Sequence, residues 1–367
     1  MHRPETSRNR SARAWRPLRP ALARLRASAA SIVAPISIAP VAIARGVVLT
    51  GVVAACVAGI GAAQAQAPAW PSRPVKIIAP YAPGGVTDFL AREIGTALTQ
   101  RLGVTFIVEN RPGGGGNIGL TMLARAAADG YTIGEGAANT LVANRFLYTT
   151  RPFETLRDFT PVAFVGRLPF VLVAHPSVNA GNLRVLIGAM KAGSLSYSFG
   201  SSGVGNTAHI FGELLARRAG VDLVHVPYKS SGEALRDLIA GRTQLQFITP
   251  IELAGPIQQG SVKALAVAAP ARLASMPDVP TLDESGFEGF ESPTWFGFIA
   301  PAGVAPEIVR RLNQEIREVL ATPAIRARLA RAGLELQDMS TEQFRAFIGT
   351  EMTKWEAIVR DSGVKLD

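Results

Sequence analysis

Cysteine and histidine are scarce in this 367-residue sequence, and their scarcity limits the chemistry that the chain can perform. The single cysteine is Cys56, so the rest of the chain has no thiol and no second cysteine for a disulfide. Four histidines occur, and His175, His209 and His225 are not spaced as metal ligands. The sequence therefore predicts no metal site and no thiol catalysis.

Common catalytic and nucleotide-binding motifs are also missing. No G-x-S-x-G nucleophile elbow is present, and no glycine run is followed by a P-loop lysine. The run GGGGNIG has G-x-G spacing, but it follows Arg111-Pro112 instead of a strand, and no acidic residue fits a ribose contact. We therefore expect no cofactor.

Basic residues are concentrated at the N-terminus. Residues 1–65 contain nine arginines and one glutamate, a net charge of +8, which leaves +2 of the chain's +10 for the remainder. The charge therefore gives no reason to expect nucleic-acid binding. An apolar segment, Gly46–Ile60, is followed by an A-x-A cleavage signal, Ala63-Gln64-Ala65. This order is typical of an export signal, so we assign residues 1–65 to a leader and expect a periplasmic location.

Three alternatives remain open for the leader. Its basic region is long, so a start site further downstream is one, and a transit peptide is another. The stretch VVAAC resembles a lipobox in which Cys56 would be lipidated, but apolar residues follow it and a better cleavage site comes later. The apolar segment is too short for a comfortable membrane span.

The remaining 300 or so residues are enough for two α/β domains. They open with an apolar run, Val75–Ala79, which predicts a buried strand. A Pro/Gly-rich turn, Pro80–Gly85, follows, and then a helix with apolar residues at Phe89, Leu90 and Ile94. Such a turn leaves the first N–H groups of the helix free to bind an anion. An ordinary tight βα turn has the same pattern.

Strands and helices alternate along most of the chain, which predicts βαβ units and a parallel sheet. The expected strands are Val75–Ala79, Val104–Asn110, Tyr131–Gly136, Val162–Gly166, Phe170–Ala174, Ser196–Phe199, Leu223–Val226, Gln244–Ile248, Val262–Ala268 and Trp295–Ala300. The segment Ala137–Thr160 is expected to be irregular. The C-terminal third is expected to be helical, and Ser340 with Gln343 forms a capping box at its last helix.

Three glycine-rich turns remain without an assigned role: PYAPGGVTD, RPGGGGNIG and GSSGVGNTAH. The first and third each precede a helix, and they lie in different halves of the chain. In open α/β sheets such turns lie at the carboxyl ends of the strands, where ligands bind. If the two halves face each other, both turns can donate backbone hydrogen bonds to one anion. This is the arrangement of a two-lobed binding protein that closes around its solute.

Five longer stretches occur in one order along the chain: PSRPVKIIAPYAPGGVTDFLAR, VENRPGGGGNIG, ADGYT, VDLVHVPYKSSGEALRDLIAG and WFGFIAPAG. Together they resemble the Bug-type extracytoplasmic solute receptors of tripartite tricarboxylate transporters. The resemblance implies an α/β, type II periplasmic-binding-protein fold with two α/β lobes, a ligand cleft between them and a two-strand hinge. Lobe 1 would be residues 70–168 plus 293–367 and lobe 2 residues 169–292, with crossovers near Pro169 and Ser292.

The resemblance also implies a function and a set of residues. The chain would capture a small organic carboxylate, such as a di- or tricarboxylate, as a monomer, and deliver it to membrane permease subunits without chemistry. The ligand-binding residues implied for lobe 1 are Tyr81, Ala82, Gly84, Gly85, Val86 and Thr87, and for lobe 2 Ser201, Ser202, Asn206 and Thr207. Asn139, Tyr228 and Thr249 are further candidates. We expect Asp88 to cap its helix, since a carboxylate would repel the ligand, and His209 to pack or bond locally.

Some positions depart from the family pattern and bear on the substrate. After the strand Gln244–Ile248, where such receptors often have an acidic or amide residue, this chain has Thr249-Pro250. Because an acidic residue would suit a ligand amine, its absence favours a simple carboxylate over an amino acid. Glu135 and Ser230 are further departures.

Two other functions remain as alternatives. An exported α/β hydrolase-like enzyme would need a nucleophile and a base, for which Ser201, Ser202 and His209 are the only plausible set, and no orienting acid is evident. The same binding fold could instead act as a signalling partner.

Overall fold

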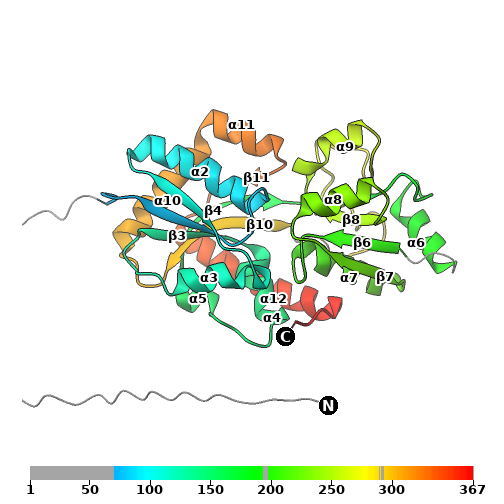
Figure 1. Ribbon diagram of the computed structural model, residues 1–367, viewed down its shortest axis with the longest axis horizontal. Coiled ribbons are helices and arrows are strands. Elements are labelled where there is room, and N and C mark those ends of the chain that lie inside the picture. The colour runs from blue at the N-terminus through cyan, green and yellow to red at the C-terminus, as the bar shows by residue number, and fades with distance from the viewer. Residues whose placement is uncertain (1–69, 193–196, 289, 291–292, 367) are drawn as a thin grey trace, which may run out of the picture. The chain divides into compact units, whose positions relative to one another are not determined.

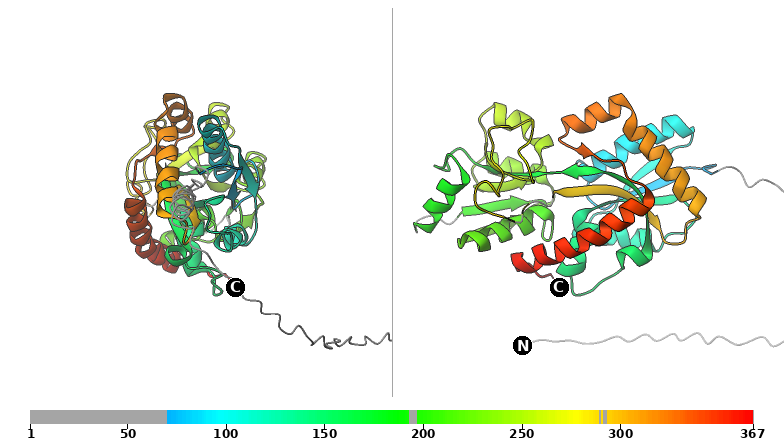
Figure 2. Two further views of the ribbon diagram at one scale, coloured as in Figure 1. Left: turned by 90° about the vertical axis from the view of Figure 1, so that its left-hand side faces the viewer. Right: turned by 180° about the vertical axis from the view of Figure 1, so that it is seen from behind.

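The computed structural model describes residues 70–192, 197–288, 290 and 293–366 (Figure 1). The predicted leader with Cys56 lies outside the described residues, as do Ser196 of a predicted strand and the crossover expected near Ser292. Within the described part, no helix combines the length and the apolar character that crossing a membrane requires. Figure 2 shows the chain from two further sides.

The first of two sheets has six strands in the order β11-β4-β10-β3-β1-β2. They are β1 Val75–Ala79, β2 Phe106–Asn110, β3 Thr132–Ala137, β4 Phe159–Leu168, β10 Thr294–Pro301 and β11 Glu335–Leu336. β1 is parallel to β2 and β3, whereas β10 is antiparallel to β3 and β4, and β11 to β4. The prediction of parallel pairing is confirmed for β1, β2 and β3 and is wrong for β4, β10 and β11. Helical crossovers join only β1, β2 and β3, and β10 enters the sheet from a much later part of the chain.

The second sheet has five strands in the order β7-β6-β8-β5-β9. They are β5 Phe170–Ala174, β6 Tyr197–Ser201, β7 Leu223–Pro227, β8 Leu245–Ile248 and β9 Lys263–Ala268. β6 is parallel to β7 and β8, and β5 is antiparallel to β8 and β9. Only Pro169 separates β4 from β5, so the chain passes almost directly from the first sheet to the second. The exact boundaries of the two lobes stay a prediction.

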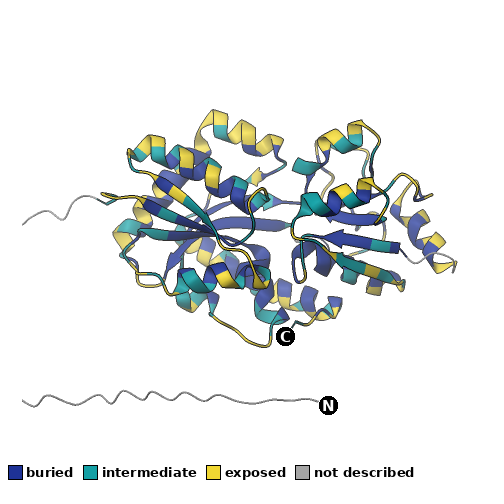
Figure 3. Cartoon of the chain, viewed as in Figure 1, coloured by how far each residue is buried: buried dark blue, intermediate teal, exposed yellow. Residues whose placement is uncertain are grey.

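Helices cover both sheets (Figures 1 and 3). They are α2 Val86–Leu102, α3 Asn117–Ala124, α4 Asn144–Leu147, α5 Thr155–Asp158, α6 Leu183–Lys191, α7 Thr207–Ala219, α8 Ser231–Ile239, α9 Ala254–Gln258, α10 Pro306–Ala321, α11 Pro323–Arg331 and α12 Thr341–Ser362, with short turns at η1 Gly114–Gly116, η2 Asn139–Ala143 and η3 Pro250–Glu252. α2 and α10 share one hydrophobic cluster with the first sheet, and α3 and α12 share another. Figure 3 shows their buried residues facing the strands.

The helix boundaries follow from the residues at their ends. In α2 the apolar residues Leu90, Ile94 and Leu98 are buried as their spacing predicts, and Gly103 ends the helix in a left-handed conformation. At α12 the predicted capping box is confirmed, because the Ser340 hydroxyl accepts the Gln343 N–H and the Gln343 side chain accepts the Ser340 N–H.

The segment 137–160 differs from its prediction, because most of it is neither irregular nor exposed. It forms the π-helical turn η2 and the short helices α4 and α5. Leu141 and Leu147 are buried in the core, which gives the segment its packing. Polar residues obscured this in the sequence, yet they have hydrogen-bond partners within the fold. The Thr140 hydroxyl bonds the nearby backbone of Ala137, and Asn144 donates to the distant Gly115 carbonyl at 3.0 Å.

Aromatic residues join the C-terminal helix to the second sheet. Trp355 of α12 stacks on Phe211 of α7 with ring centroids 6.2 Å apart and 2° between the planes. Phe247 and Phe290 contact the edges of the same Phe211 ring, at 5.7 and 5.5 Å. Since α12 also packs on β4 of the first sheet, one hydrophobic cluster extends across both sheets.

We predict that Phe211→Ala lowers the free energy of unfolding by about 3–5 kcal/mol, because a fully buried ring is replaced by a cavity. Urea denaturation followed by circular dichroism would measure the loss. Ile118→Ala is the control, since Ile118 is exposed and its truncation should change stability by about 0.5 kcal/mol or less. Equal losses in the two variants would contradict the central place given to Phe211.

Candidate functional site

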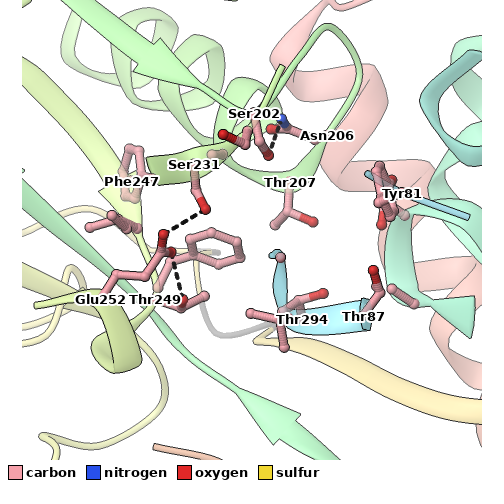
Figure 4. Close-up of a pocket in the computed structure, with 18 of the residues that line it drawn as sticks. Tyr81, Thr87, Ser202, Asn206, Thr207, Ser231, Phe247, Thr249, Glu252 and Thr294 are labelled. Carbon is pink, nitrogen blue, oxygen red and sulfur yellow. Dashed lines mark hydrogen bonds between the residues drawn. The ribbon is translucent and has the colours of Figure 1, made fainter. Parts of the chain in front are cut away.

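A pocket of about 120 Å³ lies where the two sheets meet, at the carboxyl ends of β1, β3, β6 and β8 (Figure 4). Its volume suits a small metabolite, since pockets for drug-sized ligands have about 300–1,000 Å³. The lining residues from the first sheet and its helices are Tyr81, Ala82, Gly85, Val86, Thr87, Ala137, Asn139, Thr294 and Phe296. Those from the second are Phe170, Ser202, Asn206, Thr207, Ala208, Lys229, Ser230, Ser231, Gln246, Phe247, Ile248, Thr249 and Glu252.

The turn between β1 and α2 presents the start of a helix to the pocket. Gly84 has φ +90°, a conformation that favours glycine, and Gly85 is the N-cap. No side chain caps the helix, so its first N–H groups are available to a ligand. The Thr87 hydroxyl is buried and has no hydrogen-bond partner among the described residues. Figure 4 shows the Thr87 side chain beside the cavity.

Asp88 holds this turn in place instead of facing the pocket. One carboxylate oxygen accepts the Gly84 N–H at 3.0 Å, and the other accepts bonds from Arg92 and Asn110, each at 2.9 Å. Burial acts to raise the pKa of Asp88, but these hydrogen bonds outweigh it and lower the pKa. The prediction that Asp88 caps the first turn is wrong: its carboxylate bonds the Gly84 N–H before the helix, and no side chain caps α2.

The start of α7 presents a second helix end from the other sheet. Asn206 is the N-cap, and its side-chain oxygen accepts the His209 N–H at 2.9 Å. Its amide nitrogen donates to the Ser202 hydroxyl at 2.9 Å, as Figure 4 shows. Thr207 and Ala208, the first two residues of this helix, line the pocket. The capped helix thus directs its remaining N–H groups toward the cavity.

Tyr81 and Asn139 form a polar pair on the side of the first sheet. The Tyr81 hydroxyl donates to the Gly115 carbonyl at 3.1 Å and accepts a hydrogen bond from the Asn139 amide. Burial raises the pKa of Tyr81, so the hydroxyl stays protonated at any physiological pH. Near it, Glu135 is fully buried, and neither of its carboxylate oxygens has a partner among the described residues. Burial raises the pKa of Glu135 well above its ordinary value.

Most of the residues predicted to bind ligand line this one pocket, namely Tyr81, Ala82, Gly85, Val86, Thr87, Asn139, Ser202, Asn206, Thr207 and Thr249. Gly84, Ser201 and Tyr228 do not line it. Gly84 donates its N–H to Asp88, and the Tyr228 hydroxyl donates to Asp237 at 2.8 Å, away from the cavity. Ser201 is fully buried at the end of β6. The contact of any of these residues with a ligand stays a prediction.

Ser201 belongs to a cluster with two histidines, of which His209 is buried and His225 is partly buried. Its hydroxyl oxygen lies 2.6 Å from His225 Nε2 and 3.2 Å from the Gly203 nitrogen. The His225 and His209 rings stack with centroids 3.8 Å apart, and His209 Nδ1 accepts the Gly205 N–H at 3.0 Å. His209 therefore packs and bonds locally, as predicted. Since neither Ser201 nor the two histidines line the pocket, this serine–histidine pair is not placed to attack a ligand there.

Sequence reasoning missed a polar group on the side of the second sheet, formed by Lys229, Ser231, Gln246 and Glu252. The Ser231 hydroxyl donates to Glu252 at 2.7 Å. The expectation that this end of the pocket lacks an acidic group is therefore wrong. Thr249-Pro250 does follow β8, but the turn η3 returns the chain so that Glu252 reaches the same place. The position of Glu252, four residues beyond the end of β8, was the signal available in the sequence.

Two mixed sheets joined by adjoining strands, with a pocket between them, define a type II periplasmic-binding-protein fold. Residues 90–364 match the model of the tripartite tricarboxylate transporter family receptors, and the chain belongs to this family. Among the described residues, no group of three or more acidic, histidine or cysteine side chains could hold a metal ion.

Several relatives match about four-fifths of this chain over nearly their whole own length. The protein BugT of Bordetella pertussis is 36% identical over 310 residues, 84% of this chain and 95% of its own. Among solved structures, R. palustris Rpa4515 with adipate has a TM-score of 0.76 and 32% identity, covering 80% of this chain and 98% of that one. MatC from Rhodopseudomonas palustris with bound malate has a TM-score of 0.74 and 30% identity, covering 79% and 100%.

We predict that the free energy of unfolding falls as the pH falls from about 6.5 to 5. Burial lowers the pKa of His209 to about 4, and burial with the adjacent His209 lowers that of His225 to about 3. The unfolded chain, with ordinary histidines, binds protons in this window that the folded chain does not, so stability rises with pH. Chemical denaturation at several pH values would measure the slope.

His225→Gln should flatten this slope, because it removes one of the two stacked rings. His175→Gln is the control, since His175 bonds Ser177 and leaves the stacked pair intact. A wild-type slope in His225→Gln would show that the pair is not its source.

Proposed function

We propose that this chain is a periplasmic receptor that captures a small organic carboxylate, as a monomer and without chemistry. It delivers the ligand to the membrane permease subunits of a tripartite tricarboxylate transporter. The observation that supports this most is the convergence of two uncapped or partly capped helix starts, those of α2 and α7, on one small pocket.

Hydrogen bonds alone are strong enough for this task. Each charge-assisted hydrogen bond contributes about 1.5–3 kcal/mol, and micromolar affinity requires about 8 kcal/mol. Four or five donors therefore suffice, and the pocket offers the Thr87 and Thr207 side chains besides the N–H groups of two helices. The Lys229 side chain lies at the exposed margin of the pocket, so no buried cation takes part among the described lining residues.

The near-direct passage from β4 to β5 through Pro169 suits a hinge, and closing the two sheets would bring α2 and α7 onto opposite sides of the carboxylate. The relatives with adipate and malate support a carboxylate ligand, and the leader supports export. The buried position of Ser201 disfavours the hydrolase alternative.

The proposal predicts that the purified protein is stabilised by one class of carboxylate. A ligand at about 100 times its Kd should add about 2.7 kcal/mol to the free energy of unfolding. Thermal denaturation against a panel of di- and tricarboxylates, amino acids and aromatic acids would reveal it. If no member of the panel raises the melting temperature, and calorimetry detects no binding, the receptor assignment fails.

We predict that Thr87→Val weakens carboxylate binding by at least tenfold without destabilising the empty protein. The substitution keeps the shape of the side chain and removes a buried hydroxyl that has no partner in the described structure, so only a ligand loses a bond. Titration calorimetry measures the affinity. Thr350→Val, on the far helix α12, is the matched control and should bind like the wild type. Unchanged affinity in Thr87→Val would exclude Thr87 as a ligand contact.

A further inference from the structure

The pocket has chemically different ends. On the side of the first sheet it offers hydrogen-bond donors, the N–H groups of α2 and the Thr87 hydroxyl. On the side of the second sheet, Glu252 extends a carboxylate into the lining, held by the Ser231 hydroxyl at 2.7 Å and the Thr249 hydroxyl at 3.3 Å. Figure 4 shows Glu252 across the cavity from Tyr81 and Thr87.

Gln246 adds a second acceptor at the end that holds Glu252. Its amide nitrogen donates to the Ser231 carbonyl at 3.2 Å, which fixes the orientation of the amide. Its amide oxygen is buried and has no partner among the described residues, although the residue lines the pocket and is only 1% exposed. A buried acceptor without a donor is costly, so this oxygen is placed to accept a hydrogen bond from a bound ligand.

Glu252 is likewise without a cation. Among the described residues, no lysine, arginine or histidine forms an ion pair with Glu252. Burial raises the pKa of Glu252, although its two hydroxyl partners act in the opposite direction. Lys229 also lines the pocket, but it is exposed, and water and salt screen its charge. The negative charge of Glu252 therefore has no partner inside the pocket.

We propose that the ligand is an aminocarboxylate, whose carboxylate binds at α2 and α7 while its ammonium group donates hydrogen bonds to Glu252 and Gln246. This deepens the proposed function and rests on it. An ammonium group would give Glu252 a positively charged partner and would donate a hydrogen bond to the Gln246 amide oxygen. A second carboxylate in the same place would meet two sets of acceptor oxygens and be repelled.

The test compares ligands that differ only at this end. Succinate, glutarate and adipate are paired with β-alanine, 4-aminobutyrate and 5-aminopentanoate, which have the same numbers of methylene groups, and α-amino acids extend the panel. Titration calorimetry on the wild type, Glu252→Gln, Lys229→Met and Lys191→Met gives the affinities. We expect the best aminocarboxylate to bind the wild type at least tenfold more tightly than its dicarboxylate partner.

Glu252→Gln should weaken the aminocarboxylate at least tenfold and strengthen the dicarboxylate, because the negative charge is removed while the size is kept. Lys191→Met, which removes an exposed lysine of α6 outside the pocket lining, is the charge control and should change the aminocarboxylate affinity less than threefold. The N-trimethylated form of the best ligand, which keeps the charge but has no N–H donor, should bind more weakly than the amine.

Two outcomes would overturn this inference and leave the receptor function intact. Dicarboxylates could bind best and depend on Lys229, or Glu252→Gln could leave the preference between paired ligands unchanged. If no carboxylate of either series binds the wild type, the receptor function itself fails. A fold control is circular dichroism of each variant, since Ser231 and Thr249 still have an amide oxygen to bond in Glu252→Gln.

Discussion

The first N–H groups of an α-helix have no partner within the helix, and the structure directs two such sets toward the same small space. One belongs to α2 of the first sheet and the other to α7 of the second. The surrounding residues hold these ends in place. The left-handed Gly84 shapes the first turn, Asp88 bonds it from the side, and Asn206 caps the second helix while leaving its first two residues in the lining. The proposed carboxylate would therefore meet main-chain donors that are already in position before it binds.

Three carboxyl groups near this pocket illustrate how surroundings decide charge. Asp88 accepts three hydrogen bonds, one of them from an arginine, and its pKa is lowered, so it is ionised but already paired. Glu135 is fully buried without partners among the described residues, and burial raises its pKa well above the ordinary value. Glu252 lies between these extremes, with two hydroxyl partners and no cation. Of the three, only Glu252 both lines the pocket and has no cationic partner. Its surroundings are therefore the ones that a bound ligand would change most.

Local features of the fold could be predicted from the sequence because they depend on neighbouring residues. β1 has the predicted bounds, the α2 stripe is buried, and the α12 capping box is present. The direction of β10 could not be predicted, because it depends on which earlier strands this segment pairs with in the folded sheet. The segment 137–160 was misjudged because its polar residues, such as Asn144, bond to distant backbone and are buried with it.

The residues of the site likewise divide into those that could be predicted from the sequence and those that could not. The glycine-rich turn at Gly84-Gly85 and the start of α7 were found from pattern and resemblance, and both reach the pocket region. Gln246 and Glu252 were missed, because their places depend on which face of β8 points inward and on the return of η3. Ser201 looked available in the sequence, but it is the last residue of β6 and is fully buried.

The flat stacking of Trp355 on Phe211 has a mechanical consequence. α12 packs against β4 at one end and against α7 near the other, so the C-terminal helix connects the two sheets. Parallel rings slide past each other at small cost, whereas pulling them apart exposes apolar area to water. The easiest relative displacement of the sheets is therefore a shear or twist in the plane of these rings. A wide opening that separates the two rings is resisted. The empty molecule would therefore stay near the geometry that binds the proposed ligand.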